Sequence, residues 1–186
     1  LVVAETRGKT LEVTLDKKVN NIQNGNVTVT VPANGGNIRS LKASSASKIT
    51  SDATLRADKF TIDASSAAKI KASVEATSCS IGSSSASKVS AEVKAVTCTV
   101  DASSASKIAL TGSAENFKAD LSSASKLDAS KFTAVNASID TSSAASVTID
   151  CSGKLTASAS SGSSIRYTGD CQTSLSKSSG GSVRKN

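Results

Sequence analysis

The sequence contains no histidine, methionine or tryptophan, and only three phenylalanines, one tyrosine and one proline in 186 residues. Without histidine, the chain lacks the commonest acid–base group at neutral pH and the commonest metal ligand. The scarcity of aromatic side chains argues against an ordinary β-sandwich or α/β core, which depends on large side chains. No run of about 18 apolar residues is present, so we expect no membrane-spanning segment. The opening Leu-Val-Val is too short for a signal peptide, and we expect that a targeting segment has been removed.

What the sequence has in abundance is serine and alanine, with 38 and 27 residues. They recur in one motif, Ser-Ser-Ala-Ser-Lys-Ile and its variants, which begins at residues 44, 65, 84, 103, 122, 142, 160 and 178. The spacing stays between 18 and 21 residues, and this regularity, together with mixed charge, argues against disorder. A single repeat of this length is too short for two helices and a turn, which argues against a helical repeat.

Aligning the repeats gives columns of like residues. The sixth motif position is always apolar, and so are most residues three and five positions before the motif, with polar residues between them. Period-2 alternation predicts short strands with one buried face, and a repeat this small can bury that face only by stacking on its neighbours. The sequence therefore predicts an all-β parallel β-helix (solenoid) with coils of about 19 residues.

Two further expectations concern the corners and the N-terminus. The third motif position is always Ala or Gly, and we expect this column to face inward at a sharp corner, with the flanking serines bonded to local backbone. Residues 1–40 lack the motif, and we expect them to form an N-terminal cap of irregular first coils before the solenoid of residues 41–186. In that segment residues 11–15 and 27–31 alternate like strands, with a turn at Asn24-Gly25, and an independent hairpin domain is the alternative.

The fifth motif position supplies the candidate ligand-binding residues. In a stack they would form a row of ammonium groups about 5 Å apart, suited to an acidic glycan. A partial acidic column (Asp63, Asp101, Asp120 and Asp140) lies two positions before the motif, and the alternative is a solvated corner where the two columns offset each other. The lysines are Lys48, Lys69, Lys88, Lys107 and Lys126.

The four cysteines fall into two pairs. Cys79 and Cys98 share an inward column, where either a disulfide or two buried thiols would fit. Cys151 and Cys171 lie 20 residues apart near turns, and we expect an inter-coil disulfide between them. No Cys-x-x-Cys spacing is present, and in-line aspartates do not converge on an ion, so we expect no metal site and no cofactor.

Charge and motif content limit the function. Residues 151–186 are the most basic part of the chain, which predicts either a solvated end or contact with an anionic surface. No basic–aromatic pattern supports nucleic-acid binding, and no catalytic residues are predicted because histidine, a nucleophile elbow and long cleft-forming loops are all missing. The C-terminal coil is open to pairing, which leaves a homo-oligomer as an option.

The repeat resembles the head GIN domain family of auto-transporter adhesins found in Bacteroidetes. Members repeat a corner of the type Ser-Gly-Ser-Gly-Asp-Ile after a short alternating strand, and residues 61–70 and 99–108 are similar in form. The resemblance implies a right-handed β-helix, export to the periplasm, the outer-membrane surface or the medium, and binding of a glycan or surface protein. The alternatives are a carbohydrate-processing β-helix enzyme and a purely structural spacer. Where the family often has Asp at the fifth corner position, this chain has Lys.

Overall fold

A computed structural model describes residues 2–16, 27–32 and 38–186. The chain divides into two units, residues 1–35 and residues 36–186. Every regular element in the described part of the chain is a β-strand, and no helix there could cross a membrane.

The N-terminal unit contains one antiparallel hairpin. Strands β1 (Val2–Arg7) and β2 (Thr10–Leu15) pair with Val2 opposite Leu15, and Gly8 takes a left-handed φ of 62° in the turn. The predicted strand at 11–15 is therefore present as β2, but its partner is β1. Residues 27–32 have no regular structure, so the strand predicted at 27–31 is wrong, and the Asn24-Gly25 turn lies outside the described residues. That residues 1–40 act as a cap stays a prediction.

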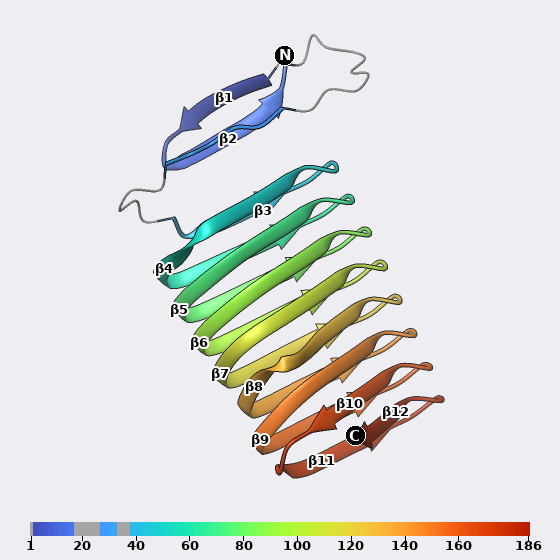
Figure 1. The fold of residues 1–186 in the computed structure, drawn as a ribbon. Helices are drawn as coiled ribbons and strands as arrows, with labels where there is room; N and C mark the ends of the chain where they lie inside the picture. The colour runs from blue at the N-terminus through green and yellow to red at the C-terminus, as the bar shows by residue number, and fades with distance from the viewer. Residues whose placement is uncertain (1, 17–26, 33–37) are drawn as a thin grey trace. The chain divides into compact units, whose positions relative to one another are not determined.

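The second unit is a parallel β-solenoid of about eight coils, which confirms the predicted fold. Its strands stack side by side with their tight corners aligned along one edge (Figure 1). Successive strands pair in parallel, and the partner residues from β5 to β7 are 19 positions apart, as the repeat predicts. The strands are β3 (Ser40–Ala43), β4 (Lys48–Ala64), β5 (Lys69–Ser83), β6 (Lys88–Ala102), β7 (Lys107–Leu121), β8 (Lys126–Thr141), β9 (Ser146–Ala159), β10 (Ser164–Thr168), β11 (Gln172–Lys177) and β12 (Ser182–Lys185).

Each coil buries alternate residues from two runs that are separated by a bend. In β5 the first run buries Ile70 and Val74, and the second buries Cys79 and Ile81. The predicted inward columns are confirmed along most of the stack. They fail at Thr173 and at Leu175, which is 39% exposed, because the last coil has a neighbour on one side only.

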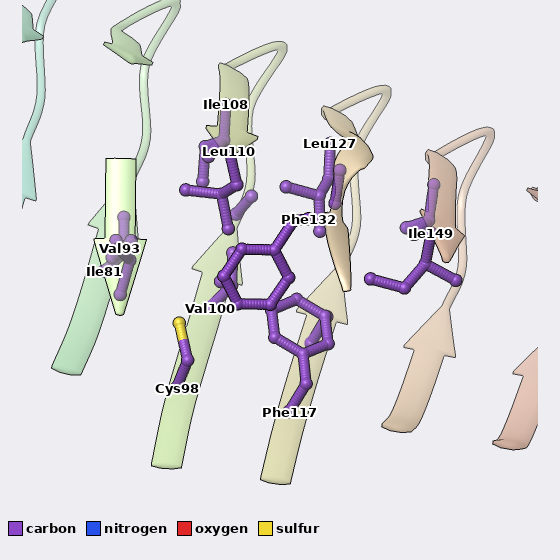
Figure 2. Packing of buried hydrophobic residues seen from close by; sticks show 14 of the residues in the cluster. Ile81, Val93, Cys98, Val100, Ile108, Leu110, Phe117, Leu127, Phe132 and Ile149 are labelled. Carbon is purple, nitrogen blue, oxygen red and sulfur yellow. The ribbon is translucent and has the colours of Figure 1, made fainter. Parts of the chain in front are cut away.

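One layer of the core holds two phenylalanines. Phe117 of β7 and Phe132 of β8 lie with their ring centroids 5.3 Å apart and their planes tilted by 51° (Figure 2). Gly112 stands directly opposite Phe132 in the β7–β8 register. A Cβ on Gly112 would lie 2.2 Å from the Val93 carbonyl oxygen, so this layer needs glycine there.

The corner differs from the prediction. The third motif position does not face inward: Ala105 and its equivalents are exposed in all eight coils. The second and third positions both take left-handed backbone, with φ of 53° at Ser104 and 60° at Ala105, and the Ser106 N–H donates to the Ser103 carbonyl at 3.2 Å. Two left-handed residues inside a four-residue hydrogen-bonded turn are the pattern of a type I′ turn. The column is small because of its backbone conformation, not because of burial.

The residue that does face inward is the fourth, which is buried in six coils as Ala68, Ser87, Ser106, Ser125, Ala145 and Ser163. In the first coil Ser47 is exposed, and in the last coil Gly181 is half-buried. In four coils the hydroxyl of the fourth residue donates to a carbonyl of the preceding coil, as Ser106 Oγ does to Ser83 at 2.9 Å. The other three such bonds are those of Ser87, Ser125 and Ser163. The serines therefore join neighbouring coils, where bonds to local backbone had been expected. No buried side-chain polar atom among the described residues lacks a partner.

Candidate functional site

The corner fixes the row of candidate lysines. Each lysine immediately follows the fourth motif position. In four of the five (Lys69, Lys88, Lys107 and Lys126) the backbone N–H donates to a carbonyl of the preceding coil, as Lys88 does to Ala68 at 2.9 Å. The pairing places each of the five lysines directly opposite the next. The structure therefore brings all five predicted lysines into one row, and Ser146, Ser164 and Ser182 continue it.

This lysine row is a strip of exposed positive charge. All five side chains are exposed, and no ion pair to any of them is found in the described part of the chain. With a strand spacing of about 4.8 Å, five coils space the outer lysines by roughly 19 Å. Neighbouring ammonium groups then lie well within a Debye length of about 8 Å, so a bound anion would experience them together.

On the other side of the corner the acidic column borders a shallow groove of about 760 Å³. Asp63, Asp101 and Asp120 line it together with the first serine of each corner, and Gly82 takes the acidic place in one coil. The head of the column is Lys42, whose Nζ lies 3.5 Å from Asp63 Oδ2. The described residues contain no ion pair between the acidic column and the lysine row, so charge is not offset there by direct contact.

Sequence reasoning found the acidic column but missed the groove and Lys42. A signal was present, because Lys42-Ala-Ser-Ser repeats the Asp63-Ala-Ser-Ser pattern with the charge reversed. The groove itself depends on how far the corner projects beyond the strands, which the repeat does not encode. Its carboxylates lie along the stack, and no group of three or more potential ligands in the described residues could hold a metal ion.

The cysteines lie in two neighbouring pairs, all present as free thiols. Cys79 and Cys98 are directly in register and fully buried. A hydrogen bond with Cys79 and burial raise the pKa of Cys98. Burial and the neighbouring Cys171 raise the pKa of Cys151 to about 11.

The basic C-terminal end is exposed. Arg166 and Arg184 face each other in the β10–β12 register, and Lys185 Nζ lies 2.9 Å from Asp170 Oδ1. The hydrogen bond and charge of Lys185 lower the pKa of Asp170. This pair removes one positive charge from the end and leaves the arginines free of ion pairs within the described residues.

Comparison with known proteins places these features in a family. A family profile described as "Putative auto-transporter adhesin, head GIN domain" matches residues 1–92 and 74–171, which together span most of the chain. No curated protein matches the chain.

Solved structures share the fold at low sequence identity. A structure described as a "putative adhesin" from Parabacteroides merdae has a TM-score of 0.75 and 19% identity, covering 80% of this chain. This chain spans only 63% of that protein's length. One described as a "Putative lipid binding protein" from Parabacteroides distasonis has a TM-score of 0.78 and 15% identity over 100% of this chain and 78% of its own. A "putative adhesin" from Bacteroides fragilis has a TM-score of 0.73 and 16% identity over 100% and 77%. Likeness at these identities establishes the fold.

Proposed function

The chain belongs to the family described as "Putative auto-transporter adhesin, head GIN domain", and we propose that it is an exported, non-enzymatic β-solenoid that binds an acidic glycan through the lysine row. The single observation that carries this proposal is the register of the five lysines on consecutive coils. A linear polyanion carries charges at regular intervals, and a rigid row of cations can meet several of them without reordering the protein.

The acidic groove supports the choice of surface. Carboxylates of Asp101 and Asp120 would repel a polyanion, so an acidic glycan is expected to follow the lysine row and to avoid the groove. A neutral glycan would have no such reason to prefer the row. Charge on the ligand therefore predicts which surface it uses.

The test is binding of the purified chain to a panel of acidic and neutral glycans at low and high salt. The informative variant replaces Lys88, Lys107 and Lys126 with serine, the residue the chain itself carries at 146, 164 and 182. A lysine beside an anionic surface contributes about 1 kcal/mol, so three of them predict a loss of roughly 100-fold at low salt.

A matched control replaces Lys118, Lys131 and Lys154, which are exposed but off the row, with serine. It removes the same net charge and is expected to weaken binding far less. Equal losses in both variants would mean that binding follows net charge alone. Binding that survives the row variant but is lost in Asp101→Asn with Asp120→Asn would assign the ligand to the groove.

The same experiment distinguishes glycan binding from the alternative roles, an enzyme and a spacer or protein-binding module. Release of new reducing ends from a bound glycan would identify a carbohydrate-processing enzyme. Failure to bind any glycan, in a chain that remains folded, would overturn the proposal in favour of a spacer or a protein-binding module.

A further inference from the structure

The second cysteine pair lies where the last strands join the stack. β9 pairs in parallel with β10 before the bend and with β11 after it, and both pairings have the same offset (positions 150 with 168, and 154 with 172). This offset places Cys151 opposite Gly169 and Cys171 opposite Gly153. The two cysteines are therefore diagonal neighbours on adjacent coils, at the bend between the two pairings.

The two thiols also interact. Cys171 packs against the core that contains Cys151, and the nearby Cys171 adds to the burial that raises the pKa of Cys151. Cys151 is fully buried, and its Sγ lies 3.3 Å from the Lys154 carbonyl oxygen, whereas Cys171 is half-buried. Cys171 is thus the cysteine of the pair that is partly open to solvent, whereas Cys151 is enclosed in the core.

We propose that Cys151 and Cys171 form an inter-coil disulfide that fastens the last strands to the stack when the folded protein meets a small-molecule disulfide such as oxidised glutathione. The Cys171 thiolate attacks one sulfur of the oxidant, forms a mixed disulfide and releases one glutathione thiolate. Cys151 then gives its proton to solvent, attacks the Cys171 sulfur and displaces the second glutathione thiolate. The two cysteines together lose two protons and two electrons, and the S–S bond of the oxidant is reduced.

The other pair serves as an internal comparison. Cys79 and Cys98 are in direct register, but they are only 1% and 0% exposed. Neither sulfur can be reached by an oxidant without local unfolding, so this pair is expected to stay reduced in the folded protein. We therefore expect solvent access to the thiol, more than the distance between the two cysteines, to decide which pair forms a disulfide.

A disulfide between Cys151 and Cys171 would stabilise the C-terminal end of the stack. Every residue of β11 is exposed, and its described pairing is to β9 alone. Ends of this kind open locally before the body of a fold. A covalent link at Cys171 would hold the start of β11 in place and slow that opening.

Peptide mapping tests the proposal directly on the full chain. Trypsin cleaves after Lys and Arg, which places the four cysteines on four different peptides. The folded protein is equilibrated with a glutathione redox mixture, free thiols are blocked with iodoacetamide in denaturant, and the protein is digested without reductant. The peptides are residues 72–88, 95–107, 132–154 and 167–177.

The expected product is peptide 132–154 joined to peptide 167–177, with loss of alkylation at both Cys151 and Cys171. Cys79 and Cys98 are expected to be recovered alkylated. Cys171→Ser should abolish the linked product, and Cys79→Ser should leave it unchanged.

The same oxidation in denaturant controls for the reagent, because an unfolded chain exposes all four thiols. The proposal is overturned if the denatured chain oxidises while Cys151 and Cys171 in the folded chain stay free. It is also overturned if the folded chain links Cys79 to Cys98 instead. Both readouts use the wild-type chain, so a poorly folding variant cannot decide the result.

Discussion

Replacing Ala105 with glycine is expected to stabilise the protein, although the same change inside a strand would weaken it. Ala105 is exposed at the third corner position with φ of 60°, and it makes one corner bond, from its N–H to the Ser123 carbonyl at 2.9 Å. Glycine keeps that bond and removes no buried surface. The chain already carries glycine at the equivalent positions 162 and 180.

The magnitude follows from two opposing contributions. A left-handed backbone costs a residue with a Cβ about 1–2 kcal/mol, and glycine does not bear that cost. Glycine also gains freedom in the unfolded chain, which removes about 0.4–1 kcal/mol of the benefit. The net expectation for Ala105→Gly is an increase of roughly 0.5–1 kcal/mol in the free energy of unfolding.

Ala109→Gly is the matched control, because Ala109 is exposed on β7 in the same coil and lies in a strand. It is expected to lower the free energy of unfolding by about 0.5–1 kcal/mol. Urea unfolding followed by circular dichroism should move the two midpoints in opposite directions. If both substitutions lower the midpoint, the left-handed corner is not the reason for the small residues in this column.

Three other expectations follow from buried contacts. Ser106→Ala removes the hydroxyl bond to the Ser83 carbonyl, which still accepts from the Ser103 N–H, and it is expected to lower the free energy of unfolding by about 0.5–1 kcal/mol. A larger drop, measured from the urea midpoint, would mean that the hydroxyl stabilises the corner by more than this one bond. Gly112→Ala places a Cβ against the Val93 carbonyl and is expected to cost more than about 2 kcal/mol, and a wild-type midpoint would refute this packing. The pKa of Cys151, raised from 9.0 to about 11 by burial first, means that the unfolded chain loses this proton before the folded chain does. The free energy of unfolding should therefore be full below pH 9 and fall as pH rises toward 11, with a smaller fall in Cys151→Ala.

Much of the solenoid could be predicted because residues at the same motif position in successive repeats are the residues that pair in the sheet, so aligning the repeats also gives the strand register. Ile70 and Val89 occupy one motif position, and they pair directly in the sheet. The lysine row followed for the same reason, since Lys69 and Lys88 are also equivalent positions.

The corner was predicted wrongly because small residues have two physical causes. A column of Ala such as Ala86 and Ala105 fits either a crowded interior or a left-handed backbone, and composition does not separate them. The change to Gly162 and Gly180 in the last coils was the available clue, because glycine relieves backbone strain more than it fills space. The groove, and the approach of Cys171 to Cys151, depend on bends and projections that spacing alone does not carry.

The type I′ corner has a consequence for how such a surface can change. Its hydrogen bonds are made by backbone atoms, including the N–H of the fifth residue, and by the buried side chain of the fourth residue. The outward side chain of the fifth residue takes no part in holding the coil. Lys126 is replaced by Ser146 in the next coil, and the φ values of the two corners still agree within 2° (52° and 59° against 50° and 61°). In each coil the side chain at the fifth motif position can therefore be substituted without loss of the corner hydrogen bonds, and one coil can change independently of the others. Related chains could diverge widely in what they recognise while keeping one architecture and one stability.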